Sequence, residues 1–183
     1  MNPSDDGYEV KRMQELREYN ILDTLTEEEY EQITYLATVI CDVPIALISF
    51  IDENRQWFKS HLGVSDSETL REHSFCAHAI NSPEELMVVP DSRKDERFKD
   101  NPYVTGSPNV VFYTGIPLLS REGYGLGTIC VIDHKPKELN QQQLKALKIL
   151  SLQVMSLLET RRTNARLEKA LQEWKAKVKN GDI

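Results

Sequence analysis

Cys76 and His78 are the residues of this chain whose types and spacing point most directly to chemistry. A cysteine becomes a nucleophile when an imidazole contacts it or when positive surroundings lower the pKa of its thiol. Side chains two positions apart do not share one face of a helix, so this pair is poorly placed for such contact. We therefore interpret Cys76 as a small core residue and His78 as a hydrogen-bonded helix residue. A redox-active thiol at Cys76 or Cys130 is kept as an alternative.

The other cysteines and histidines form no recognisable metal or disulfide pattern. A structural zinc ion needs four ligands, and the remaining candidates are scattered singly: Cys41, Cys130, His61, His73 and His134. Three cysteines, an odd number, also argue against a disulfide framework. We therefore assign no metal ligand and no catalytic residue.

The glycine-rich segment 123–127 superficially resembles a phosphate-binding loop. Such a loop needs its glycines between a strand and the start of a helix, where free N–H groups meet the anion. Here strand-forming residues follow Gly127. The segment is therefore predicted to be the turn of a β-hairpin, in which glycine supplies a positive φ.

The charge balance excludes several classes of function. The 183-residue chain has 22 Lys and Arg against 29 Asp and Glu, a formal net charge of -7, and its basic residues form no stripe that would bind nucleic acid phosphates. No apolar run approaches the roughly 20 residues of a membrane-spanning helix, and residues 1–6 lack the apolar core of a signal peptide. We expect a cytoplasmic protein that binds neither nucleic acid nor a membrane.

Periodicity predicts a strand-rich middle flanked by helices. Strands are expected at 44–50, 55–62, 86–89, 110–119 and 126–133. Helices are expected at 8–21, from Thr26 to Val43 with a Thr26–Glu29 capping box, and at 74–81 with Ser74 as the cap. The second helix should bury one apolar face made of Tyr30, Ile33, Leu36, Ala37 and Ile40. The strands are expected to be joined by hairpins and do not alternate with helices. This order predicts an α+β fold with an antiparallel sheet.

Aromatic residues predict a second apolar layer. Phe98 and Tyr103 interrupt the polar loop 91–108, so we expect this loop, with one helical turn, to fold over something apolar. Phe112 and Tyr113 are neighbours in a strand and therefore face opposite sides of the sheet. One of the two points away from the main core.

A long helix is predicted at the C-terminal end. No proline or glycine occurs from Leu139 to Gly181, which allows about forty helical residues, or about 60 Å. Its second half has a heptad pattern, with Leu157, Asn164, Leu171 and Val178 at one seam position and Thr160, Leu167 and Trp174 at the other. This pattern predicts a coiled coil in a homodimer, in which Asn164 fixes the register.

Seven blocks of sequence occur in an order typical of one known family. They are ILDT (21–24), PIALIS (44–49), RQWFKS (55–60), SFCAHAI (74–80), VVPD (88–91), Phe112-Tyr113 and LGTICVID (126–133). From about Met13 to Arg162 the chain resembles a bacterial GAF domain of the sensor subfamily often fused to histidine kinases or diguanylate cyclases. The resemblance implies a central antiparallel sheet of five or six strands, with terminal helices on one face and short helices and loops over the other.

The resemblance also implies a small-molecule pocket under those short helices. The positions expected to line it are Ser74, Cys76, His78, Asp91, Phe98, Tyr113 and Cys130. The known ligands of the family do not transfer, because the cyclic-nucleotide signature is missing, Ala77 separates Cys76 from His78 unlike the bilin-attaching pair, and the cysteines are not arranged as in methionine sulfoxide reductases. The ligand and any cofactor stay unassigned.

The sequence therefore predicts a sensory or regulatory domain that is not an enzyme. We expect an N-terminal helical segment (1–25), a GAF domain (26–160) and a C-terminal signalling helix or coiled coil (161–183). The domain would bind a small molecule or a partner and relay its state, through a dimeric C-terminal helix, to an output domain such as a histidine kinase or diguanylate cyclase. The alternatives are a cysteine-dependent redox enzyme of the GAF fold and a purely structural dimerisation domain.

Overall fold

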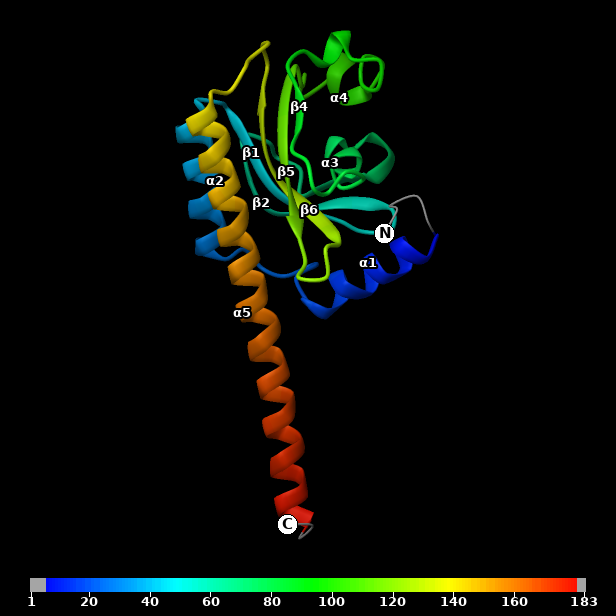
Figure 1. Cartoon of the computed structure of the whole chain (residues 1–183), viewed down its shortest axis with the longest axis vertical. Helices are drawn as coiled ribbons and strands as arrows, with labels where there is room; N and C mark the ends of the chain where they lie inside the picture. The colour runs from blue at the N-terminus through cyan, green and yellow to red at the C-terminus, as the bar shows by residue number, and fades with distance from the viewer. Residues whose placement is uncertain (1–5, 181–183) are drawn as a thin grey trace.

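The computed structural model describes residues 6–180 and shows an α+β fold built on one sheet (Figure 1). Its α-helices are α1 (Asp6–Glu18), α2 (Glu28–Cys41), α3 (Phe75–Ala79), α4 (Pro102–Thr105) and α5 (Gln141–Asn180). Its strands are β1 (Ile45–Ile51), β2 (Arg55–Leu62), β3 (Glu68–Leu70), β4 (Met87–Val89), β5 (Phe112–Leu119) and β6 (Gly125–Asp133). Two short 3-10 helices, η1 (Arg71–His73) and η2 (Ser92–Lys94), complete it.

The sheet has six antiparallel strands in the order β3-β2-β1-β6-β5-β4, as the predicted fold class requires. β1 and β6 lie at its centre, and every residue of both strands is buried. This explains why these two segments are apolar at successive positions rather than at alternate ones. β3 was not expected, because its three residues, Glu-Thr-Leu, lie at the sheet edge and carry no strand pattern.

The two faces of the sheet pack against different elements. Phe112 and Trp57 belong to a core formed with α1, α2 and the first half of α5. Tyr113 and Phe58, their neighbours in sequence, belong to a second core formed with α3 and the loop before β5. Figure 1 shows α2 and α5 on one side of the sheet and α3 and α4 on the other. The expected split of Phe112 and Tyr113 between two layers is confirmed, and Trp57 and Phe58 divide in the same way.

The start of α2 differs from the prediction. The Thr26–Glu29 capping box does not form, because α2 begins at Glu28 and Glu27 occupies the N-cap without a side-chain capping bond. The Glu27 carboxylate instead pairs with Lys59 on β2 at 2.5 Å and with Arg161 on α5 at 2.9 Å. The side chain of Lys59 is fully buried, so its need for a counter-charge decides this geometry.

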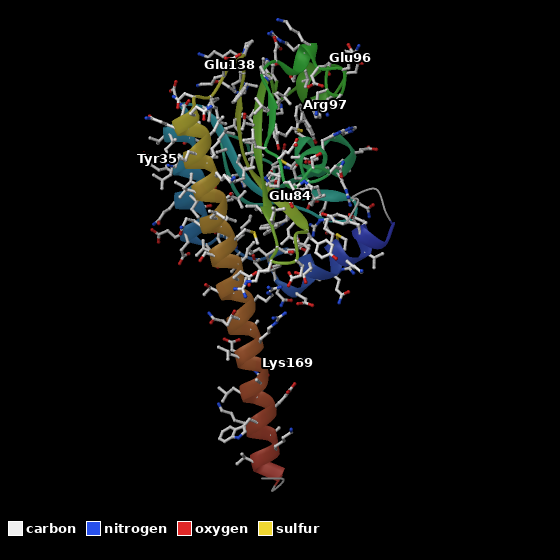
Figure 2. The ribbon with its side chains drawn as sticks, in the orientation of Figure 1. Tyr35, Glu84, Glu96, Arg97, Glu138 and Lys169 are labelled. Carbon is white, nitrogen blue, oxygen red and sulfur yellow. The ribbon has the colours of Figure 1, made fainter. Side chains whose placement is uncertain are left out.

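One residue predicted for the apolar face of α2 lies outside it. Tyr30, Ile33 and Ala37 are buried, but Leu36 is 44% exposed. Tyr35 and Val39 are also exposed, and Tyr35 points outward from α2 in Figure 2. The helix therefore has a buried stripe toward the sheet and a second apolar stripe toward the surroundings.

The segment between β4 and β5 is more ordered than expected. It contains two short helical elements, η2 and α4, where one turn was predicted. Asp91 and Asn101 start these elements by accepting backbone N–H bonds from Arg93 and Tyr103. Phe98 lies between them and is 1% exposed, which confirms that this polar loop folds over an apolar layer.

α5 is one continuous helix of 40 residues, as predicted. Its first half is held against the sheet by Leu147, Leu150, Val154 and Leu158, all buried. Every side chain from 166 to 179 is exposed, and this part projects away from the sheet, as Lys169 shows in Figure 2. Within residues 6–180, α5 is not apolar enough along any window to cross a membrane, nor is any other helix.

We expect Gly127→Ala to unfold the protein, because Gly127 pairs with Phe50 at the centre of the sheet. An added Cβ would lie 1.9 Å from the Ser49 carbonyl oxygen and 2.8 Å from the Phe50 Cα, and neither backbone atom can move aside. The expected loss is more than about 3 kcal/mol of unfolding free energy, measured by urea denaturation. Gly123→Ala is the control: it strains a turn at φ 85° but meets nothing within 4 Å, so it should cost only about 1 kcal/mol. Equal losses in both variants would contradict this account.

Candidate functional site

The candidate site is a cavity of about 60 Å³ between the sheet and the elements that cover its second face. Its inner wall comes from β1, β2, β5 and β6 through Leu47, Gln56, Phe58, Tyr113 and Ile132. Its outer wall includes η1, α3 and the loop before β5, through His73, Ser74, Phe75, Cys76, Tyr103, Pro108 and Val110. Val64, Asp66 and Thr69 lie at a rim that is exposed or half-buried. The cavity therefore reaches the surface beside β3.

Gln56 is the polar centre of this cavity. Its Nε2 donates to Ser49 Oγ and to Cys76 Sγ, each at 3.0 Å. Its Oε1 accepts from Ser74 Oγ at 2.5 Å, while Ser74 Oγ also accepts from the Ala77 backbone N–H as the cap of α3. One buried amide thus connects β1, β2 and the start of α3. The predicted Ser74 cap is confirmed.

Two cysteines meet beside this amide. Cys76 Sγ lies 3.7 Å from Cys130 Sγ, and the Tyr113 hydroxyl donates to Cys76 Sγ at 3.3 Å. Tyr113 has room for this contact because Gly115 follows it on the same face, where a Cβ would lie 2.2 Å from the hydroxyl. The Thr128 hydroxyl is buried beside the same sulfur and has no partner at hydrogen-bond distance among the described residues.

The two thiols have opposite pKa shifts. Burial raises the pKa of the Cys76 thiol, but the polar groups around it, Cys130 first and then Ser49, Thr128 and Tyr113, outweigh burial and lower that pKa to about 6. The hydrogen bond to Cys76, with burial, raises the pKa of Cys130 well above its usual range. These opposite shifts favour the thiolate at Cys76 over the thiolate at Cys130.

Aromatic rings close the outer wall. The Phe75 ring stacks on Phe98 with centroids 4.0 Å apart and an interplanar angle of 12°, and it also contacts Tyr113 at 5.1 Å. Phe98 lies behind Phe75 and supports the wall without lining the cavity. Phe75 therefore holds α3 over the sheet through its contacts with the rings of Phe98 and Tyr113.

The structure brings together Ser74, Cys76, Tyr113 and Cys130 of the seven positions expected to line a pocket, with Phe98 one layer behind. His78 and Asp91 lie elsewhere. His78 is two positions from Cys76 on α3 and therefore points away, where it contacts the edge of Phe98 at 4.9 Å. Burial, and then Arg97, lowers the pKa of His78.

Asp91 pairs with its sequence neighbour Arg93. Its carboxylate accepts from Arg93 Nε at 2.8 Å and Nη2 at 2.9 Å and starts η2. The hydrogen bond from Arg93 lowers the pKa of Asp91 to about 2. It lies on a separate surface depression with Lys94, Pro136 and Lys137.

Sequence reasoning missed Gln56, Ser49 and Thr128. Gln56 lies two positions before Phe58, so strand alternation places both on the cavity side of β2. A polar residue on an otherwise apolar inward face is the signal that points to a buried hydrogen-bond network. Ser49 and Thr128 face each other across β1 and β6 and carry no comparable local signal.

The size of the cavity limits what it can hold. Pockets for drug-sized ligands are typically about 300 to 1,000 Å³, whereas this one is about 60 Å³. It admits a molecule of only a few heavy atoms unless α3 moves. Within residues 6–180, no three His, Cys, Asp or Glu side chains are grouped to hold a metal ion.

Gln56→Leu tests whether this amide holds the site together. It leaves the hydroxyls of Ser49 and Ser74 buried without their partner, which should cost about 2 kcal/mol of unfolding free energy, measured by urea denaturation. Thr69→Val is the matched control, because its hydroxyl reaches Gln56 Oε1 only at 3.5 Å and Thr69 is half-buried; its change should stay within about 0.5 kcal/mol. A loss for Gln56→Leu no larger than the control would contradict the central role of Gln56.

Comparison with solved structures identifies the fold. The GAF domain of an Acinetobacter phosphoenolpyruvate-protein phosphotransferase superposes with a TM-score of 0.59 at 14% identity, covering 86% of this chain and 96% of that one. A Sinorhizobium meliloti domain, whose parent protein is named as a two-component sensor histidine kinase, superposes with a TM-score of 0.61 at 17% identity, covering 80% of this chain and 99% of that one. The predicted GAF fold is confirmed. No family model matches the sequence.

Comparison with curated proteins adds a relative of stated activity. A cyclic di-GMP phosphodiesterase of Pseudomonas aeruginosa is 38% identical over 156 residues, which are 85% of this chain and 26% of the relative. The chain thus spans about a quarter of that protein's length. The expectation that the chain is not an enzyme is contradicted by this match, because the relative is named as an enzyme.

Proposed function

We propose that this chain, which has the fold of a GAF domain, is a sensory module that controls cyclic di-GMP phosphodiesterase activity. The match to a cyclic di-GMP phosphodiesterase along 85% of the chain carries the proposal. Support comes from the fold, which places a small cavity on one face of the sheet and a projecting helix on the other. The cavity would receive the signal, and α5 would transmit it.

A chain of ion pairs that begins at the buried Lys59 offers a route between the two faces. Gln56 lies on the cavity side of β2, and Lys59, three positions later, reaches the opposite side, where it pairs with Glu27 at 2.5 Å. Glu27 also pairs with Arg161 of α5 at 2.9 Å. A displacement of β2 caused by a ligand would therefore change the anchoring of α5. We propose that this path couples the cavity to the output helix.

α1 and the residue that follows it contact α5 next to Arg161. Arg162 is 5% exposed and pairs with Glu15 of α1 at 3.2 Å and with Glu159 at 3.0 Å. The Tyr19 hydroxyl donates to Glu159 at 2.6 Å, and the Arg162 guanidinium lies over the Tyr19 ring. These bonds mark where α5 stops packing on the sheet. Arg166 also pairs with Glu18 of α1 at 2.6 Å, and every side chain of α5 from 166 to 179 is exposed.

A second copy of the chain is the proposed partner of α5. Large apolar side chains with 44% or more of their surface exposed gather on α2 and α5: Tyr35, Leu36, Val39, Ile149, Leu152, Leu167, Leu171, Trp174 and Val178. A monomer rarely leaves such a series exposed. The last four follow the heptad spacing predicted for a coiled coil, in which identical helices cover each other's seam. The homodimer and its coiled coil are thus part of this proposal.

The double variant Leu171→Glu with Trp174→Glu should dissociate this dimer, because it places four carboxylates in the seam. We expect the full chain to sediment as a dimer at tens of micromolar and the variant as a monomer, in sedimentation equilibrium runs. Ala176→Glu is the control, because it adds a carboxylate at an exposed heptad position on the far side of α5 and should leave the dimer intact. A wild-type chain that sediments as a monomer would refute the proposed dimer.

A chimera tests the control of activity. Replacing the matching segment of the Pseudomonas phosphodiesterase with this chain should preserve hydrolysis of cyclic di-GMP. Arg161→Gln in that chimera should change the hydrolysis rate at least about twofold, because it removes the pair with Glu27. Lys169→Gln, which removes an exposed charge from the projecting part of α5, is the matched control. The double variant Leu171→Glu with Trp174→Glu is measured in the same chimera. Equal hydrolysis rates for the unchanged chimera, Arg161→Gln and this double variant would refute the proposed control.

A further inference from the structure

We infer that Cys76 and Cys130 are a peroxide-responsive dithiol: a small hydroperoxide entering the cavity oxidises Cys76, and Cys130 then closes a disulfide with it. This inference goes beyond the proposed control of phosphodiesterase activity and does not depend on it. It names a chemical signal for the cavity and a modification site.

The geometry of the two sulfurs supports the disulfide. Their Sγ atoms are 3.7 Å apart, both cysteines are free, and a disulfide needs about 2.05 Å. Cys130 is fixed at the centre of the sheet, paired with Leu47 of β1 and Gly115 of β5. Cys76 lies on α3, a helix of five residues that covers the cavity. Closing the gap therefore moves the cover and leaves the sheet in place.

The surroundings of Cys76 favour its thiolate. Gln56 Nε2 at 3.0 Å and the Tyr113 hydroxyl at 3.3 Å both donate to its sulfur. The polar groups Cys130, Ser49, Thr128 and Tyr113 lower the pKa of Cys76 to about 6 against the effect of burial, which favours the thiolate at neutral pH.

The cavity selects the oxidant by size. Its volume of about 60 Å³ is several times the roughly 10–15 Å³ that a cavity needs to hold one water molecule. Hydrogen peroxide, with two heavy atoms, fits this space, and the half-buried rim at Val64 and Thr69 gives it a way in. A bulky aromatic hydroperoxide does not fit.

The chemistry balances in two steps. The Cys76 thiolate attacks one peroxide oxygen, so that an S–O bond forms, the O–O bond breaks, and the departing hydroxide takes up a proton to give water. The Cys130 sulfur then attacks the sulfur of the resulting sulfenic acid. An S–S bond forms, the S–O bond breaks, and the second hydroxide leaves as water with the Cys130 proton. Two thiols are oxidised by two electrons, and one hydrogen peroxide is reduced to two waters.

Cys41 is an internal control within the same chain. It is buried at the end of α2, and burial raises its pKa to about 11. It belongs to the core on the other face of the sheet, away from the cavity. If peroxide attacked buried thiols in general, Cys41 would also be oxidised. If oxidation depends on the inferred site, Cys41 should stay reduced.

Peptide mapping tests the inference on the reduced full chain. After hydrogen peroxide treatment at neutral pH, the chain is denatured in N-ethylmaleimide and digested without reductant. We expect a Cys76–Cys130 disulfide within one chain, formed at least about tenfold faster than Cys41 is oxidised. Cumene hydroperoxide should react at least about tenfold more slowly than hydrogen peroxide, because it exceeds the cavity. Oxidation of Cys76 no faster than that of Cys41, or equal rates for both oxidants, would overturn the inference.

Single variants separate the two roles. In Cys130→Ser, Cys76 should stop at the sulfenic acid, which dimedone added together with the denaturant then captures. In Cys76→Ser, Cys130 should stay reduced over the same period, whereas Cys41→Ser should form the disulfide at the wild-type rate. Oxidation of Cys130 in Cys76→Ser at the wild-type rate would overturn the assignment of Cys76 as the attacking sulfur. Mapping of the wild-type chain keeps the test valid if a variant does not fold.

Discussion

The pairing of β1 with β6 at the centre of the sheet is the constraint on which the rest of the structure depends. Both strands are buried along their whole length, so successive side chains supply two cores at once. Ile129 and Val131 belong to the core under the terminal helices, whereas Cys130 and Ile132 belong to the core on the other face. A shift of one residue in this register would exchange the two sets. Gly127 is required here because only a residue without a Cβ allows the strands to meet.

Local signals in the sequence account for most of the fold. The Ser74 cap, the hairpin at Gly123 and the uninterrupted α5 each depend on residues within a few positions, and each forms as expected. The start of α2 was missed because a distant buried cation, Lys59, recruits Glu27. β3 was missed because three edge residues gain their order from β2, not from their own pattern.

The candidate site was harder to predict, because it is assembled from distant segments. Cys76 and Cys130 are 54 positions apart and meet only because α3 packs against β6. The residue types could be chosen in advance, but the contact that lowers the pKa of Cys76 could not. Asp91 was an attractive candidate by type, yet Arg93, two positions away, already satisfies its charge. Contacts between residues far apart in the sequence therefore form this site. A residue such as Asp91, whose charge is paired with a sequence neighbour, takes no part in it.

The sheet also limits how a signal can pass through the molecule. The cavity and α5 lie on opposite faces, so any coupling must cross a layer of paired strands that resists deformation. β2 has an irregularity in that layer, because its register with β1 shifts between Ile48 and Ser49, beside the Gln56 network. Such an irregularity lets a strand bend without breaking its remaining bonds. Movement of α3 would act on Gln56 first, and β2 would carry it to Lys59 and the base of α5.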